Sequence, residues 1–162
     1  MPTLAMEAKE WLLERYGEDG WDELTDDAKK ETFLRLLDQK IHEARVMLIE
    51  RFDWICSQSP ESAKFMYENN TMVGYVPEEG IRSALKHGTL AIGQLGLAET
   101  LQILIGQDQT TDGGMVLAKQ IEQLFKDRCA EFKEEDHLNF GVYYSPECVK
   151  HSICGGKHSN ML

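Results

Sequence analysis

The sequence predicts an α/β protein with a helical amino-terminal half and a parallel β-α-α-β unit in its second half. Two observations lead to this class. Apolar residues recur every three or four positions over residues 4–57, which is the period of amphipathic helices. Two short apolar runs, residues 89–95 and 138–144, are separated by two further helical patterns. This order of strand, two helices and strand is typical of a parallel crossover.

The amino-terminal half contains a short and a long helical pattern. We expect a helix over residues 4–16 that ends at the glycines of residues 17–20. A long helix should follow over residues 26–57, because Thr25 can cap it and the acidic residues after Thr25 complement the helix dipole. The apolar stripe of the first helix is Leu4, Ala8, Trp11 and Leu12; that of the second is Leu34, Leu37, Ile41, Ala44, Leu48, Phe52 and Ile55.

The remaining elements follow from caps, glycines and periodicity. Ser59 and Pro60 open another helix that fades at residues 69–70, and residues 71–80 read as a loop. We expect a strand buried on both faces at 89–95, helices at 96–105 and 115–135, and a second strand at 138–144. The stripe of the last helix is Leu117, Ile121, Leu124, Phe125 and Phe132.

Composition limits the possible partners. The chain has 162 residues, of which 28 are acidic and 17 basic, so the formal net charge is −11. This charge disfavours nonspecific binding to nucleic acid or to anionic membranes, because both depend on clustered lysine and arginine. No apolar run has the length of a membrane span, and the amino terminus does not resemble a signal peptide. We therefore expect a cytoplasmic protein whose four cysteines are free thiols.

Three stretches carry a resemblance to a known family. Residues 87–99 read HGTLAIGQLGLAE, residues 138–146 read LNFGVYYSP, and residues 1–8 read MPTLAMEA. They resemble the motifs HGTL-(S/A)-IG-x-x-GLAE, NF-x-x-x-x-(T/S)-P-A-E and N-(L/M)-P-(R/T)-L-A-x-E-A of the anaerobic ribonucleoside-triphosphate reductases, the glycyl-radical class of ribonucleotide reductase. The resemblance covers residues 1–146 and implies part of that family's barrel of parallel strands flanked by helices. We expect residues 147–162 to be a divergent, disordered tail.

The resemblance also implies a reaction, cofactors and partners. Members of this family reduce ribonucleoside triphosphates to deoxyribonucleotides for DNA synthesis, with a protein thiyl radical that takes the 3′ hydrogen. The family carries its thiyl cysteine before the first motif, and a four-cysteine zinc site and a glycyl radical after the last. This sequence contains no CxxC pair and no RVCGY-like glycine motif. We therefore expect an interior segment that holds no cofactor of its own and is inactive alone; its implied partners are the ribonucleoside triphosphate and a radical-activating enzyme.

A second interpretation assigns the chain to another class of protein. In it, the chain is a non-catalytic helical interaction module whose long helix, residues 26–57, packs on a partner. In either case, exposed apolar helix faces and unpaired strand edges favour self-association.

The turn after the second predicted strand is the first candidate site. Ligands of α/β proteins gather at the carboxyl ends of strands. Tyr144, Ser145 and Pro146 match the family's turn, which implies contact with the substrate phosphates. Glu147 and Cys148 replace the alanine and glutamate of the motif, however, and the alternative is an ordinary strand-to-loop turn.

His87 is the second candidate. It precedes the first predicted strand beside Gly88, where a histidine could face the substrate. The alternative, a structural histidine with satisfied hydrogen bonds, is the commoner case.

The third candidate is the tail, where four residues have the chemistry of zinc ligands: Cys148, His151, Cys154 and His158. Their spacing is not that of a common zinc finger, and the flexible pair of residues 155–156 lies among them. We favour a tail without metal and without a function of its own.

This interpretation of the tail can be tested by elemental analysis. We expect no stoichiometric zinc in the purified chain, because the stretch lacks the apolar anchors of a structural metal site. One zinc per chain that disappears in Cys148→Ser or Cys154→Ser would contradict it.

Overall fold

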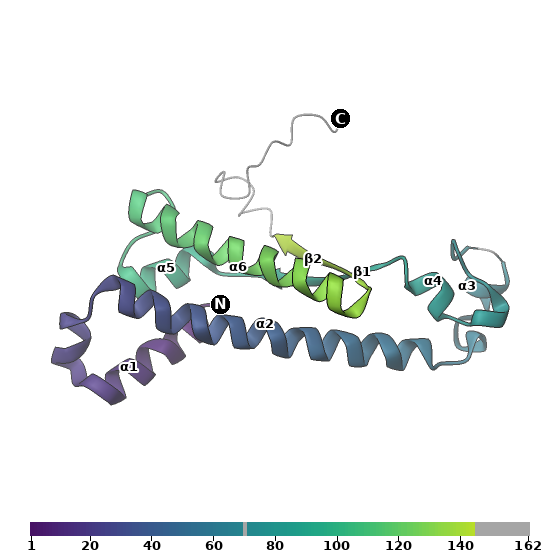
Figure 1. Ribbon diagram of the computed structural model, residues 1–162, viewed down its shortest axis with the longest axis horizontal. Helices are drawn as coiled ribbons and strands as arrows, with labels where there is room; N and C mark the ends of the chain where they lie inside the picture. The colour runs from purple at the N-terminus through teal and green to yellow at the C-terminus, as the bar shows by residue number, and fades with distance from the viewer. Residues whose placement is uncertain (70, 145–162) are drawn as a thin grey trace.

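Two long helices and a pair of short strands dominate the computed structural model, which describes residues 1–69 and 71–144 (Figure 1). The predicted tail, residues 147–162, lies outside the described residues. In chain order the elements are α1 (Pro2–Glu23), α2 (Asp26–Cys56), the 3-10 turn η1 (Pro60–Ala63), α3 (Lys64–Glu68), the 3-10 turn η2 (Pro77–Glu79), α4 (Arg82–Leu85), β1 (Thr89–Gln94), α5 (Leu97–Ile105), α6 (Asp112–Asp136) and β2 (Asn139–Tyr144).

Strands β1 and β2 form a parallel pair in which Thr89 lies beside Asn139 and Gln94 lies beside Tyr144. Parallel neighbours cannot be joined by a tight turn, so α5 and α6 return the chain to the start of the second strand. The predicted α/β class, the helical amino-terminal half and the β-α-α-β unit are confirmed.

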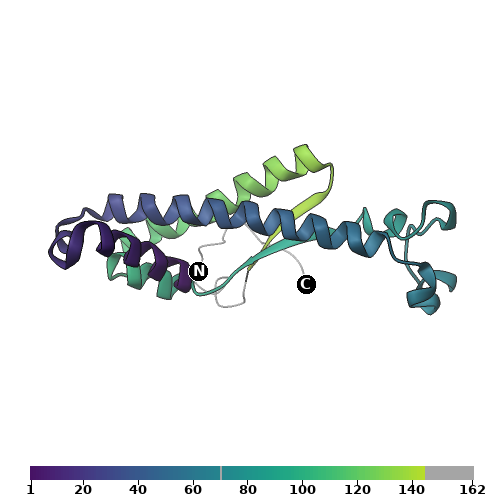
Figure 2. The ribbon, with the colours of Figure 1, turned by 90° about the horizontal axis from the view of Figure 1, so that it is seen from below.

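Helices α2 and α6 cover one face of the strand pair, which the two views of Figure 1 and Figure 2 show together. The side chains of Ile92 and Phe140 belong to the core under this helix layer. The other buried members of that core are Leu4, Ala5, Ala8, Phe33, Leu37, Ile41, Leu97, Leu101, Leu104, Leu117, Ala118, Ile121, Phe125, Cys129 and Phe132.

The opposite face of β1 is open. Thr89, Ala91 and Gly93, which alternate with the inward residues, are exposed. The prediction that this strand is buried on both faces is therefore wrong for the described residues. The apolar run allowed burial on both sides, but the helices described here pack on one side of the strand only.

Helix α1 departs from its prediction in length and in its buried stripe. It kinks at Gly17, where φ is 75° and ψ is 177°, and then continues helically to Glu23 instead of ending. Ala5 is fully buried, whereas Trp11 is 41% exposed. The guanidinium groups of Arg15 and Arg35 lie 5.3 and 5.6 Å from the centre of the Trp11 ring. These cation–π contacts explain how a large aromatic side chain stays at the surface.

Helix α2 begins where the sequence predicted. The hydroxyl of its cap, Thr25, accepts a hydrogen bond from the backbone N–H of Ala28 at 3.3 Å. Phe33, which the predicted stripe omits, is fully buried. The helix ends one residue before the predicted boundary, at Cys56.

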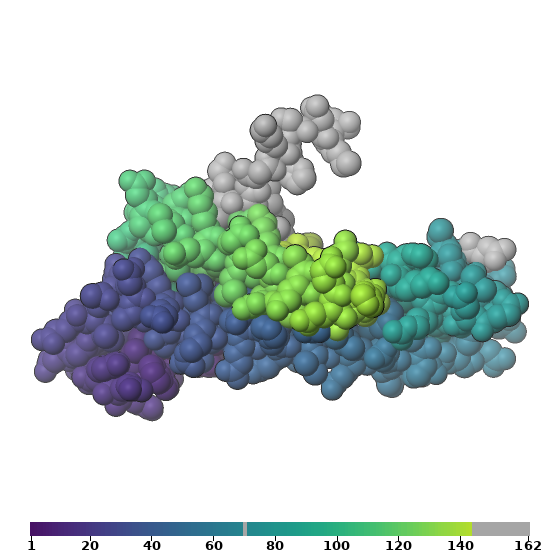
Figure 3. Space-filling model, viewed as in Figure 1, coloured from purple at the N-terminus to yellow at the C-terminus, as the bar shows by residue number. Residues whose placement is uncertain are grey.

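The segment between α2 and β1 lies at one end of the molecule, in teal beside the end of α2 in Figure 3. Ser59 caps η1, as its sequence position predicts, and the helix expected there is split into η1 and α3. The predicted loop, residues 71–80, contains only the short turn η2, and α4 was not predicted. Arg82 fixes the segment to α2 through an ion pair with Asp53 at 2.8 Å.

Two arginines join α2 to α6 in opposite senses. Arg45 of α2 donates from Nε and Nη2 to Asp136 at 2.8 and 2.7 Å, and Arg128 of α6 donates from Nε and Nη2 to Asp38 at 2.6 and 3.2 Å. These carboxylates raise the pKa of both guanidinium groups above the ordinary arginine value, so both remain charged. Bidentate pairs fix orientation as well as distance. They therefore hold the two helices in one register.

None of the helices within residues 1–69 and 71–144 combines the length and the apolar character that crossing a membrane requires.

Edge-to-face ring contacts that join α2, α6 and β2 give a stability prediction. Phe132 is fully buried, and its ring centre lies 5.2 Å from that of His42 and 5.5 Å from that of Phe140. Phe132→Ala should lower the free energy of unfolding by about 3–5 kcal/mol, the usual cost of an emptied aromatic site. Phe65→Ala, at a side chain that is 73% exposed, is the matched control and should change it by less than about 0.5 kcal/mol. Equal effects in urea denaturation would contradict this account of the core.

Candidate functional site

The carboxyl ends of β1 and β2 are the best candidate for a functional site. The parallel register places Gln94 and Tyr144, the last residues of the two strands, side by side. In open parallel sheets, ligands bind beyond this edge, where loops and helix starts supply polar groups. We refer to this region as the carboxyl edge.

Two helices also begin at the carboxyl edge. The Met1 amino group donates a hydrogen bond to the backbone oxygen of Leu95 at 3.3 Å, so the start of α1 touches the end of β1. Helix α5 begins directly after Gly96, with Glu99 in its first turn. Burial lowers the pKa of the Met1 amino group, and the negative charge of Glu99 partly opposes that effect. The edge thus combines two strand ends with two helix starts.

Gly96 permits this close approach. Its φ of 75° lies in the left-handed region, and a Cβ added there would lie 2.4 Å from Cγ of Pro2. Thr100 fixes the same turn, because its hydroxyl donates to the backbone oxygen of Gly96 at 2.7 Å. Glycine is therefore required here both for its backbone angle and for the absence of a side chain.

Gln94 is a functional candidate that the sequence interpretation missed. It is 2% exposed, and its Oε1 atom is buried without a hydrogen-bond partner among the described residues. Most buried side-chain polar atoms have a hydrogen-bond partner, so the unpaired oxygen marks a position where a water, an ion or a ligand group fits. The sequence feature that could have predicted it is a glutamine at an inward position of a strand whose other inward positions are apolar.

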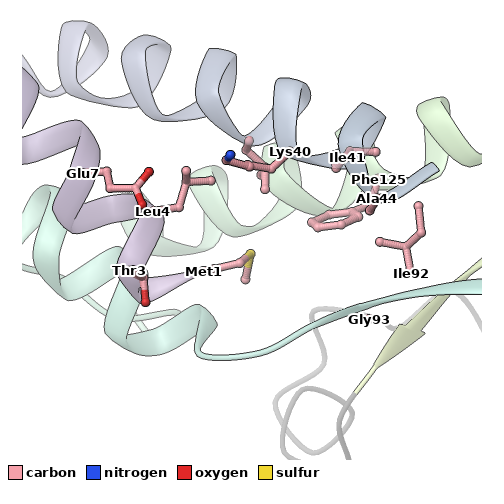
Figure 4. A pocket seen from close by; sticks show the side chains of 11 residues that line it. Met1, Thr3, Leu4, Glu7, Lys40, Ile41, Ala44, Ile92, Gly93 and Phe125 are labelled. Carbon is pink, nitrogen blue, oxygen red and sulfur yellow. The ribbon is translucent and has the colours of Figure 1, made fainter. Parts of the chain in front are cut away.

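A cavity of about 310 Å³ lies next to the carboxyl edge, between α1, α2, α6 and β1 (Figure 4). Most of its lining is apolar, and Glu7 and Lys40 are its charged members. Lys40 is hydrogen-bonded to Glu43 at 2.7 Å, an interaction that raises the pKa of the Lys40 ammonium and lowers that of the Glu43 carboxyl. The apolar lining suits side chains better than a triphosphate.

Comparison with known proteins identifies the family. The family model of anaerobic ribonucleoside-triphosphate reductase matches residues 1–148. The chain belongs to this family. It is 28% identical over 120 residues to the anaerobic ribonucleoside-triphosphate reductase of Escherichia coli strain K12, an alignment that covers 71% of this chain and 17% of that protein. The chain thus corresponds to about a sixth of the length of this reductase relative.

Of the three residues that the anaerobic reductase motif points to, Tyr144 belongs to β2. Tyr144 is the last residue of the strand. Its side chain, Ser145 and Pro146 lie outside the described residues, so contact with substrate phosphates stays a prediction.

His87 lies at the other end of the sheet. It precedes the first residue of β1, it is exposed, and its ring packs beside Gly74. The six residues of the strand separate it from the carboxyl edge, a span of roughly 20 Å. The structure therefore does not bring His87 and Tyr144 together.

The cysteines of the described residues do not form a reactive or metal-binding group. Cys56 lies at the end of α2 and Cys129 is buried in α6. Burial raises the pKa of both thiols, which keeps them protonated at neutral pH. Within residues 1–69 and 71–144, no three histidine, cysteine or acidic side chains are grouped to hold a metal ion. The four ligand candidates of the tail (Cys148, His151, Cys154 and His158) lie outside those residues.

Two glycines provide a matched test of the carboxyl edge. Gly96 and Gly106 both have left-handed backbones, but a Cβ at Gly106 would meet nothing within 4 Å. Gly106→Ala should therefore cost only the backbone strain, about 1–2 kcal/mol. Gly96→Ala should cost roughly 1–3 kcal/mol more, because the new methyl group overlaps Pro2. Equal losses in urea denaturation would show that α1 does not press on this turn.

Proposed function

We propose that this chain is a segment of a cytoplasmic anaerobic ribonucleoside-triphosphate reductase and that the carboxyl edge forms part of its substrate site. The family match over residues 1–148 is the observation that carries the proposal. The parallel strand pair supports it, because the two strands that carry the matched motifs end at the same edge of one sheet.

In this proposal, different residues of the carboxyl edge contact different portions of the substrate. The substrate phosphates lie against the turn of Tyr144, Ser145 and Pro146, beyond the end of β2. The nucleoside extends along the ends of the strands toward Gln94 and Gly96. Since the chain carries a net charge of −11, binding of a triphosphate depends on local backbone N–H groups and not on overall attraction.

The radical chemistry requires groups from outside this chain. In the family a glycyl radical supplies the unpaired electron, and no glycine motif for it occurs in this sequence. The protonated thiols of Cys56 and Cys129 do not fit the thiyl role, because the first lies at the far end of α2 and the second faces the core. The contribution of this chain is therefore to bind and orient the nucleotide, with the radical-activating enzyme acting on the complete reductase.

The alternative, a helical interaction module, has less support. The inner face of α2 packs on α1, α5, α6 and β1 of the same chain. Of the predicted apolar stripe, Leu37, Ile41 and Phe52 are buried, and the other members are partly buried.

The proposal predicts the behaviour of two proteins. The chain alone, with a radical-activating enzyme and ribonucleoside triphosphates under anaerobic conditions, should form no deoxyribonucleotide above background. A chimera of the E. coli reductase, with its matched segment replaced by residues 1–148, should bind ribonucleoside triphosphates and retain activity. We expect its rate to fall by up to about 100-fold, the usual cost of small misplacements.

Two outcomes would contradict the proposal. Turnover by the isolated chain would show that it does not need the rest of the reductase for catalysis. A folded chimera that binds no ribonucleoside triphosphate would show that the carboxyl edge does not serve the substrate.

A further inference from the structure

Four polar side chains are buried among the described residues: Ser83, Gln94, Thr100 and Glu122. Three of them have partners within the chain. The hydroxyls of Ser83 and Thr100 donate to backbone oxygens at 2.6 and 2.7 Å, and Glu122 is paired with Lys126 at 2.6 Å. By contrast, Oε1 of Gln94 has no hydrogen-bond partner among the described residues. This oxygen therefore does not help to hold the fold together.

Gln94 lies where we propose that the substrate binds. It is the last residue of β1, and the parallel register places it beside Tyr144. Leu95, the next residue, is 68% exposed, so the chain reaches the surface directly after Gln94. The unpaired oxygen thus belongs to the carboxyl edge.

The unpaired oxygen lowers the stability of the chain. A buried acceptor without a partner loses its hydrogen bonds to water and gains none in return, whereas an apolar side chain of similar size avoids this cost. Residues that are unfavourable for stability in this way are common at sites that bind a ligand. Since Oε1 is held by no hydrogen bond, the amide can turn toward a ligand without breaking one.

The chemistry of an amide oxygen limits the groups that it can bind. Oε1 accepts hydrogen bonds and cannot donate them. The ionised phosphate oxygens of a nucleotide are also acceptors, so they do not pair with it. The donors of a nucleotide are its ribose hydroxyls, which all ribonucleoside triphosphates share, and the N–H groups of the base, which differ from one base to another. An acceptor that serves the whole substrate class therefore suits the ribose.

The width of the strand pair also favours the ribose. Neighbouring strands lie about 4.8 Å apart. In the proposed function the phosphates lie against the turn that follows Tyr144, and the ribose is joined directly to them. Gln94 is one strand away from that turn. The sugar is therefore the portion of the nucleotide that comes beside Gln94, and the base lies further from the phosphates.

We infer that Oε1 of Gln94 accepts a hydrogen bond from a ribose hydroxyl of the bound nucleotide. The inference rests on the proposed function and deepens it, because it assigns one residue to the sugar. A ligand without that hydroxyl leaves the buried acceptor unpaired, and sites of this kind discriminate against such ligands. Gln94 thus distinguishes a ribonucleotide from the analogue that lacks the hydroxyl.

Nucleotide titrations of the whole chain, and of the chimera described above, test this inference. The probes are ATP, CTP, GTP and UTP, each with its 2′-deoxy and its 3′-deoxy analogue, and calorimetry measures the affinities. We expect one of the two analogues to bind about tenfold more weakly than the parent nucleotide, the effect of one lost hydrogen bond. Which analogue is weakened identifies the hydroxyl.

The variant Gln94→Met keeps the length of the side chain and removes the acceptor. It should bind the ribonucleotides about tenfold more weakly and should no longer distinguish them from the weaker analogue. Its midpoint of urea unfolding should stay the same or rise, because the unpaired oxygen is gone. A residue with a purely structural role would not combine these two effects.

Two matched controls separate position from chemistry. Oε1 of Gln109 is also buried without a partner among the described residues, but it lies in the loop between α5 and α6. Gln109→Met should therefore leave nucleotide binding unchanged. Thr100→Val removes a hydroxyl that is hydrogen-bonded within the chain at the same turn, so it should lower the urea midpoint.

Three results would overturn the inference. These are equal affinity for the ribonucleotides and both analogues, unchanged nucleotide binding by Gln94→Met, and a fall in the urea midpoint of Gln94→Met as large as that of Thr100→Val. The first requires no variant, so it decides even if Gln94→Met does not fold. Each of them leaves the proposed function in place, whereas a failure of both the chain and the chimera to bind any nucleotide would refute the proposed function itself.

Discussion

The parallel pairing of β1 with β2 is the constraint on which the rest of the structure depends. Because both strands run in the same direction, the chain must cross the full length of the sheet between them, and α5 and α6 are the elements that do so. The same pairing brings Gln94 and Tyr144 to one edge. The parallel pairing of the two strands therefore determines both the order of the elements and the place of the candidate site.

The helix layer determines which face of the strand pair is buried. Bidentate ion pairs at Arg45 and Arg128 tie α2 to α6, and the ring of Phe132 lies between the helices and Phe140 of β2. The Arg45 guanidinium also lies 4.6 Å from the centre of the Phe132 ring. Charged and apolar contacts thus meet at one position, where the cation shields the rim of the core.

Membership in the anaerobic reductase family agrees with an acidic chain that has no reactive thiol among its described residues. The described part has a sheet edge, two helix starts and an apolar cavity beside them. In the proposed function, a segment of this kind contributes the position of the nucleotide, and other parts of the reductase supply the radical.

The sequence by itself determined the long helices α2 and α6, the strand pair and the family, because these depend on local periodicity, caps and short motifs. Thr25 and the apolar stripe of α2 predicted both ends of that helix to within one residue. The two apolar runs predicted the two strands of the parallel pair. Only the tertiary structure decided that Phe33 is buried in the core and that Trp11 stays at the surface, where Arg35 of α2 reaches its ring. It also decided that His87 and Tyr144 lie at opposite ends of the sheet and that Gly96 must admit Pro2. Such relations join residues far apart in the chain, and local patterns carry no information about them.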